Sequence, residues 1–177
     1  GKPTRLCSTT KMPLRDDTGQ IIGTFGISRD ITSYLQAEEA LNQERDRLQT
    51  LMNHLPDVIF IKDTAGRFLM ANPALVKLYG ANLPEDLIGQ KDENFIPQSL
   101  ADHFVEDDRQ VMECGVPLVD REESNVDAEG RPLWMLTSKI PLRDSDGKLM
   151  GLVGIGRNIT RQKVAEQQAR RQAMEAG

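Results

Sequence analysis

One block of this sequence occurs twice. Residues 9–23 (TTKMPLRDDTGQIIG) return as residues 137–151 (TSKIPLRDSDGKLMG), so that Lys11 is matched by Lys139, 128 positions later. The match extends through residues 29–32 (RDIT), which return as residues 157–160 (RNIT). An offset of this size is about one domain length. The sequence therefore predicts the tail of one domain followed by a complete second copy, as in a tandem array.

The composition is that of a globular protein. Hydrophobic residues make up 38% of the 177 positions, and the net charge of −5 argues against a nucleic-acid partner. No apolar run approaches the roughly 20 residues of a membrane span. Cys7 and Cys114 lie in different repeat units without metal-like spacing, which is typical of reduced thiols in a cytoplasmic protein. Because the sequence begins inside a repeat, we expect it to be part of a longer chain that could be attached to a membrane.

The repeated unit has the pattern of a β-hairpin. Residues 131–142 and 148–155 are extended apolar segments, and the turn 144–147 (DSDG) separates them. Gly151, Gly154 and Gly156 interrupt the second strand, where glycine costs entropy and packs nothing. They indicate the close approach of a backbone or a bulky side chain. Phosphate binding is the alternative, and it is weaker because no glycine-rich turn leads from a strand into a helix.

A helix is expected after each copy of the hairpin. Residues 33–55 form a connector helix, begun by Thr32 or Ser33 and ended before Pro56. Apolar residues on this helix follow heptad spacing, broken at Glu44, and predict a parallel coiled-coil dimer. The alternative is a helix packed on its own domain. Residues 161–177 form the start of an exit helix with a weaker apolar seam. The predicted dimer seam consists of Tyr34, Leu41, Leu48, Leu51 and Leu55.

Residues 56–160 read as one complete domain between these helices. Two strands come first, then several short helical segments, a longer helix and three more strands. This order predicts an α+β fold, with a five-stranded antiparallel sheet, short helices on one face and long flanking helices. Its elements are expected at 57–62, 67–71, 72–79, 82–87, 92–95, 97–114, 116–124, 131–142 and 148–155.

These residues resemble a known family. The order of elements, residues 66–68 (GRF) leading into residues 72–74 (NPA), and the closing residues 157–160 (RNIT) look like a PAS sensory domain over residues 51–160. Residues 1–32 resemble the last two strands of a preceding PAS domain. The family ends on an Asp-Ile-Thr motif at the exit into a signalling helix. Asp30 matches that aspartate, whereas Asn158 departs from it and can still cap a helix.

The resemblance implies a sensor or relay module of bacterial signalling. Such modules lie upstream of histidine kinases of two-component systems, diguanylate cyclases or transcription factors, and they form homodimers. Either they bind a small molecule between the sheet and the short helices, or they bind nothing and act as dimerisation scaffolds. The module itself is expected not to be an enzyme; an output domain would lie elsewhere in the full-length chain. Its signal exit would consist of Arg157, Asn158, Ile159 and Thr160.

The sequence names no ligand. Family members with covalent flavin photochemistry carry an Asn-Cys-Arg-Phe-type motif, and the corresponding residues 89–95 contain no cysteine. A haem member needs an axial ligand, for which His103 is the sole weak candidate; a surface position is favoured for it. Trp134 would stack on a ligand or fill the core against the helices. The predicted ligand-contact residues, of which strand alternation allows only some to point inward, are Phe95, Phe104, Trp134, Leu136, Val153 and Ile155.

Charged residues offer weaker signals. Lys139 and Arg121 lie on strands that should be neighbours and could receive an anionic ligand. Because Lys11 repeats at the position of Lys139, the shared block reads more easily as scaffold. The acidic runs 106–108 and 122–123 look solvated, and no catalytic triad, paired carboxylate site or metal-ligand cluster emerges.

Overall fold

The structure, a computed structural model, describes residues 5–175. The chain divides after Thr50 into two compact units. The first holds strands β1 (Cys7–Arg15) and β2 (Ile21–Asp30), paired as an antiparallel hairpin, and most of helix α1 (Thr32–His54). Cys7 and the second cysteine, Cys114, are both exposed and free.

The hairpin turns show why the repeated block folds as it does. In the first copy the Asp16 carboxylate accepts hydrogen bonds from the backbone N–H groups of Thr18 and Gln20, both at 2.9 Å. In the second copy Asp144 accepts from Asp146 at 3.0 Å and from Lys148 at 2.9 Å. Such a short acidic side chain stabilises a tight turn by binding the backbone two and four residues ahead. The turn predicted at 144–147 is therefore confirmed.

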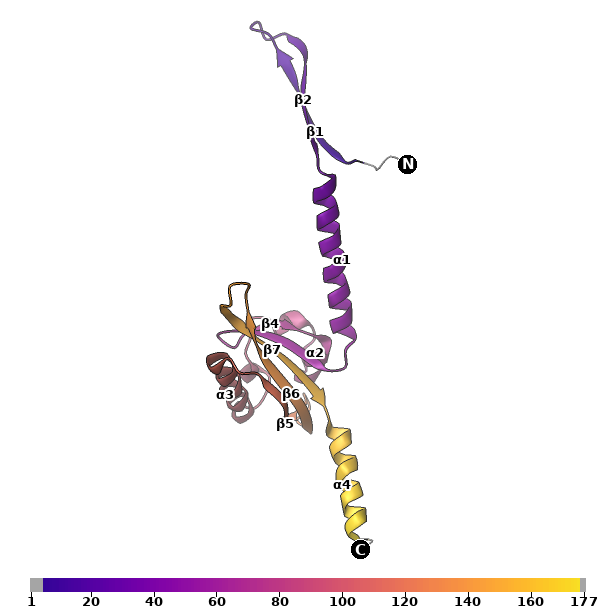
Figure 1. The fold of residues 1–177 in the computed structure, drawn as a ribbon, viewed down its shortest axis with the longest axis vertical. Helices are drawn as coiled ribbons and strands as arrows, with labels where there is room; N and C mark the ends of the chain where they lie inside the picture. Colours follow the sequence, from indigo (N-terminus) through magenta and orange to yellow (C-terminus); the bar gives the residue numbers. More distant parts are fainter. Residues whose placement is uncertain (1–4, 176–177) are drawn as a thin grey trace. The chain divides into compact units, whose positions relative to one another are not determined.

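The second unit contains one five-stranded sheet (Figure 1). All paired strands are antiparallel, in the order β4-β3-β7-β6-β5. The α+β fold predicted from the order of elements is confirmed. The strands are β3 (Val58–Asp63), β4 (Phe68–Ala71), β5 (Leu118–Val126), β6 (Pro132–Arg143) and β7 (Leu149–Asn158). The helices are α2 (Pro73–Tyr79), η1 (Pro84–Asp86), η2 (Asp92–Asn94), α3 (Gln98–Cys114) and α4 (Thr160–Glu175).

Asn72 joins the first helix of this unit to the sheet. It is fully buried, and its side-chain oxygen accepts hydrogen bonds from Leu75 N at 3.2 Å, which caps α2, and from Ile59 N in β3 at 3.0 Å. Its amide nitrogen donates to the carbonyl of Asp57 at 2.9 Å. A buried amide that satisfies both its donor and acceptor groups fixes the path of the chain. The Asn-Pro pair therefore begins α2 in one orientation on the sheet.

The helical segments cover one face of the sheet, and strand alternation decides which side chains meet them. Along β6 the buried residues are Met135, Thr137 and Lys139, whereas Trp134 is 40% exposed on the opposite face. The core around α2 consists of Val58, Phe68, Ala71, Leu75, Val76, Leu87 and Met135. A smaller cluster under α3 consists of Ile96, Ala101 and Phe104.

The glycines of β7 sit where side chains would collide. A Cβ atom on Gly151 would lie 1.9 Å from the carbonyl oxygen of Lys62, and one on Gly154 would lie 2.1 Å from the ring of Phe60. One on Gly156 would lie 3.1 Å from the terminal methyl group of Met135. The prediction that these glycines mark the close approach of a backbone or a bulky side chain is confirmed.

Helices α1 and α4 carry no buried residues. Among residues 5–175, no helix is both long and apolar enough to cross a membrane.

Gly154→Ala should lower the free energy of unfolding by about 2–3 kcal/mol, because overpacking a filled core forces rings and backbone to shift. Urea denaturation of the two proteins measures the difference. Gly156→Ala is the matched control; its one tight contact would be the flexible end of Met135 at 3.1 Å, so we expect a smaller loss. Equal losses from the two substitutions would contradict this account of the strand.

Candidate functional site

Two buried lysines and two buried aspartates form an ionic network between the sheet and the helices. Lys62 of β3 is 1% exposed, and its ammonium lies 2.7 Å from Asp108 Oδ2 of α3 and against Asp92 of η2. Lys139 of β6 is 2% exposed and lies 2.6 Å from Asp108 Oδ1. Two positive and two negative charges balance, as burial requires. The network binds both α3 and η2 to two strands of the sheet.

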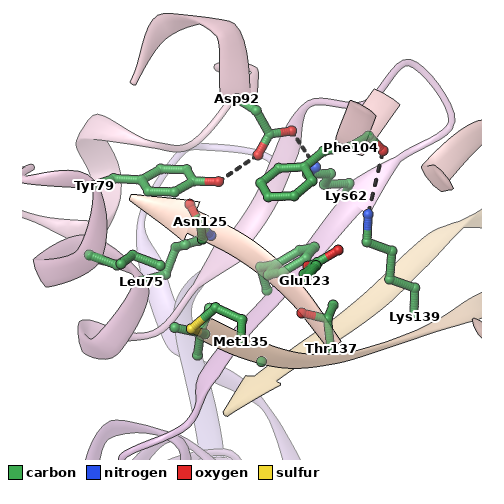
Figure 2. Close-up of a pocket in the computed structure, with 14 residues that line it drawn as sticks. Lys62, Leu75, Tyr79, Asp92, Phe104, Glu123, Asn125, Met135, Thr137 and Lys139 are labelled. Carbon is green, nitrogen blue, oxygen red and sulfur yellow. Dashed lines mark hydrogen bonds and ion pairs between the residues drawn. The ribbon is translucent and has the colours of Figure 1, made fainter. Parts of the chain in front are cut away.

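Aromatic rings and a phenol complete the shell around Lys62. Its ammonium lies 5.1 Å from the centroid of the Phe60 ring and 5.0 Å from that of Phe68, distances at which cation–π attraction acts. The Tyr79 hydroxyl donates a hydrogen bond to Asp92 Oδ1 at 2.7 Å. Figure 2 shows Asp92 between the Tyr79 hydroxyl and the Lys62 ammonium. Asp92 is therefore held from two sides.

The environment sets the protonation state of these groups. Burial alone lowers the pKa of the Lys62 ammonium, but the carboxylates of Asp108 and Asp92 outweigh it, so this pKa lies above its ordinary value. Burial raises the pKa of Tyr79 well above its ordinary value, and the Asp92 carboxylate adds to the effect. At neutral pH Lys62 is charged and Tyr79 is a neutral donor, so the network keeps its pairing.

A cavity lies beside this network, between the sheet and the helices. Its volume of about 30 Å³ exceeds the ~10–15 Å³ that one water molecule needs. One part of its wall is apolar and the other carries charged and polar groups, a mixture typical of sites that orient small polar molecules. The lining residues are Val58, Phe60, Lys62, Leu75, Leu78, Tyr79, Asp92, Phe104, Glu123, Asn125, Met135, Thr137, Lys139 and Gly156 (Figure 2).

The predicted ligand-contact residues divide between the two faces of the sheet. Phe104 lines the cavity, and Phe95 packs against the core and stacks on Tyr79, with ring centroids 5.6 Å apart. Trp134 is 40% exposed and does not line this cavity, so the expectation that it fills the core against the helices was wrong. That it stacks on a ligand stays a prediction. Three predicted residues do not line the cavity, namely Leu136, Val153 and Ile155. On β6 and β7 the residues next to them in the sequence point toward the helices instead.

Three of the five acidic residues that looked solvated in the sequence are buried, which is a second correction; Glu106 and Glu122 are exposed as expected. Asp107 and Asp108 are 4% and 3% exposed, and Glu123 is 8% exposed. The cations considered for an anionic ligand already have carboxylate partners here: Lys139 pairs with Asp108, and Arg121 pairs with Asp107 at 2.8 Å. The scaffold interpretation of Lys139 thus agrees with its surroundings. The side chain of His103 is 47% exposed, beside Asp107.

The start of α4 is hydrogen-bonded to β6 through the backbone of Trp134. Its N–H donates to Thr160 Oγ1 at 2.9 Å, and its carbonyl accepts from Ile159 N at 2.8 Å. Asn158 Oδ1 accepts from Thr160 N at 3.0 Å, and Arg157 pairs with Asp57 at 3.0 Å. The four residues predicted as the signal exit thus lie where strand β7 passes into α4.

The first copy of the repeat makes the same exit contacts. Leu6, 128 positions before Trp134, donates its N–H to Thr32 Oγ1 at 2.7 Å and accepts from Ile31 N at 2.9 Å. Asp30 Oδ1 accepts from Thr32 N at 3.0 Å. Asp30 and Asn158 therefore perform the same capping role, in which an amide oxygen serves as well as a carboxylate.

The fold and this exit define a sensory domain of the PAS class. The family model described as the PAS fold matches residues 1–34 and 52–164. The chain belongs to the PAS family.

Curated relatives are signalling proteins. The chain is 31% identical over 139 residues to the methanogenesis regulatory histidine kinase FilI of Methanothrix harundinacea, covering 76% of this chain and 15% of FilI. It is 28% identical over 120 residues to a diguanylate cyclase of Vibrio cholerae, covering 67% and 37% of the two chains. The sequence thus spans well under two thirds of these relatives.

Solved structures include similar domains. A structure described as VqmA bound to DPO has a TM-score of 0.58 and 30% identity, covering 63% of this chain and 56% of that one. The PAS domain of BvgS from Bordetella pertussis has a TM-score of 0.53 and 23% identity, covering 75% and 98% of the two chains. The similarity to the BvgS domain, at 23% identity, shows a shared fold.

Lys62→Met should lower the free energy of unfolding by about 3–5 kcal/mol, because it leaves two buried carboxylates without their shared cation. Urea denaturation measures the loss, and Lys77→Met on the exposed side of α2 is the control, expected within about 0.5 kcal/mol of the parent. Adding Asp92→Asn to Lys62→Met should recover part of the stability, because Asp92 loses its cation in Lys62→Met whereas Asp108 keeps Lys139. A Lys62→Met protein as stable as the parent would contradict the network's role.

Proposed function

We propose that this chain is the sensor and relay part of a larger signalling protein, and that a small polar molecule in the cavity is its signal. The observation that carries the proposal is a cavity with charged and polar groups on one side, enclosed by the strands that lead to the exit helix. Catalysis would belong to an output domain elsewhere in the full-length protein, as the kinase and cyclase relatives suggest.

The path from cavity to exit is short. Met135 and Thr137 line the cavity from β6, and the next residue toward the start of that strand, Trp134, holds the first turn of α4 by two backbone hydrogen bonds. A ligand that moves β6 would therefore move the anchor of α4. Lys163 of α4 adds an ion pair with Glu122 of β5 at 2.5 Å and lies over the Trp134 ring at 5.7 Å. The exit helix thus contacts both strands.

Ligand binding gains support from a similar protein. VqmA, 30% identical in the aligned region, has been solved bound to DPO. The cavity here, at about 30 Å³, admits a very small molecule or requires the helical layer to open. The alternative function is a ligand-free scaffold, in which dimer packing alone passes the signal through the helices.

A homodimer would suit either function. The seam residues, four on α1 and the last directly after it, are large side chains with 47–71% exposure, namely Tyr34, Leu41, Leu48, Leu51 and Leu55. A helix with no buried residue needs a partner surface for such a stripe. A second copy of α1 offers the matching stripe, and a parallel pairing places equivalent residues together.

The hairpin offers a second surface for the same partner. Met12 and Phe25 are opposite each other in the register, so they share a face with Leu14 and Ile27, and all four are more than half exposed. A two-stranded hairpin alone is marginal in water. Dimerisation through α1 would bring two hairpins together at high effective concentration, so we propose that these apolar faces cover each other.

Thr137→Met should fill the cavity and expel its ligand. We expect native mass spectrometry of purified wild-type protein to show a retained small molecule that denaturation releases, and Thr137→Met to lose it. Leu136→Met, on the opposite face of the same strand, is the control and should keep it. A wild-type protein of bare mass, together with a Thr137→Met protein of raised melting temperature, would favour the scaffold function instead.

Leu48→Glu should weaken dimerisation at least tenfold, because burying a leucine contributes about 1.5–3 kcal/mol. Sedimentation equilibrium gives the dissociation constants. Gln49→Glu adds the same charge one residue away, off the seam, and should leave association nearly unchanged. Wild-type protein that stays monomeric at high micromolar concentration would reject the dimer.

A further inference from the structure

Three potential metal ligands converge between α3 and β5, outside the ionic network. His103 and Asp107 lie one turn apart on α3, and Glu123 lies on the inward face of β5. One ligand atom from each of the three lies within 4.8 Å of the others, and His103 Nε2 is 3.7 Å from Asp107 Oδ2. We propose that these three side chains bind a divalent transition-metal ion of the Zn²⁺ type.

Two carboxylate oxygens in this cluster have no hydrogen-bond partner. Asp107 Oδ2 and Glu123 Oε2 are buried from solvent and accept no hydrogen bond from any residue in the described part of the chain. Buried carboxylate oxygens are costly when unsatisfied, and a second negative charge nearby adds repulsion. A bound cation removes both costs, since it coordinates the oxygens and neutralises the charges. The unpartnered atoms are thus the ones a metal would use.

Arg121 orients one ligand of the proposed site and must move away from another. Its guanidinium donates to Asp107 Oδ1 at 2.8 Å, which leaves Oδ2 as the oxygen facing the cluster. A donor bound to one carboxylate oxygen orients the other oxygen toward a metal ion. Its other nitrogen lies 3.4 Å from His103 Nε2, an arrangement in which that ring nitrogen presents its lone pair. A metal needs the same lone pair, and the partly exposed Arg121 side chain has room to yield it.

The ligand set indicates the class of ion. One imidazole nitrogen with two carboxylates suits Zn²⁺, Co²⁺ or Mn²⁺ better than Ca²⁺, which prefers six to eight oxygens. With metal–ligand bonds of about 2.1 Å, tetrahedral ligands lie about 3.4 Å apart, so the cluster needs only a small closure. Three protein ligands leave at least one coordination position for water or a small anion.

Metal binding would fasten the long helix to the edge strand. His103 and Asp107 belong to α3, whereas Glu123 belongs to β5. The chain connects these two elements only through the loop after Cys114, so the ion would add a second connection between them. The inference does not depend on the proposed sensing of a small molecule. Of the three metal ligands only Glu123 also lines the cavity; His103 and Asp107 do not.

The test uses the whole chain, free of affinity tags and treated with a chelator. Co²⁺ should bind one equivalent with visible absorption bands, and Zn²⁺ should displace it; calorimetry gives the Zn²⁺ affinity. Glu123→Gln and His103→Asn should each weaken Zn²⁺ binding by at least about tenfold, since even outer-shell changes cost 10–100-fold. Asp102→Asn, beside His103 but exposed, is the control and should bind like the wild type.

Circular dichroism and melting curves establish that each variant is folded before it is titrated. If a variant fails to fold, Asp107→Asn replaces it with the same expectation. Wild-type protein that binds neither Zn²⁺ nor Co²⁺ up to millimolar concentration would overturn the site. One equivalent of Zn²⁺ that binds equally well to Glu123→Gln and His103→Asn would overturn it too, because the ion would then sit elsewhere.

Discussion

The buried ammonium of Lys62 is the constraint on which the helical layer depends. The Lys62 side chain is 1% exposed, so its charge must be paired. Its partners come from two segments farther along the sequence, Asp92 of η2 and Asp108 of α3. A buried pair adds little net stability compared with packed apolar groups, whereas a missing partner is very costly. The network therefore selects one arrangement of helices over others that would bury as much apolar surface. Lys62, Asp92 and Lys139 of the network also line the cavity, which gives it polar walls.

The two charged clusters of α3 differ in balance. Around Asp108, lysines and carboxylates match in number. Around Asp107, Arg121 is the basic partner within ion-pair distance of a site that also holds Glu123, so negative charge is in excess. The half-exposed His103 closes that side. The first cluster is suited to holding the fold, because Asp108 Oδ1, which accepts no hydrogen bond, has an ion pair with the buried Lys139 at 2.6 Å. The second is suited to receiving a cation, because Asp107 Oδ2 and Glu123 Oε2 accept no hydrogen bond within the described residues and no buried lysine is paired with them there.

The repeat and the turn chemistry allowed the sequence to predict the order of elements, the antiparallel sheet and the close contacts at Gly151 and Gly154. It could not predict which face of β6 points inward. Trp134 and Leu136 are more hydrophobic than Thr137 and Lys139, so hydrophobicity favoured the wrong alternation. Buried ion pairs could not be predicted either, because a lysine is expected to be solvated unless the carboxylate that pairs with it, far away in the sequence, is known. One signal was available: the inward phase of β6 faces the crowded glycines of β7.

The two copies of the repeat separate the contacts at the start of the following helix from the contacts of the core. Lys11 is exposed in the hairpin, whereas Lys139 is buried against α3, so the same lysine has different surroundings in the two copies. The exit contacts are nevertheless the same, since Leu6 and Trp134 both hold the following helix by backbone N–H and carbonyl groups. These bonds depend on the strand register and on one threonine, not on the core beneath. A change in strand position can therefore pass into either helix by the same geometry, whatever moves the strand.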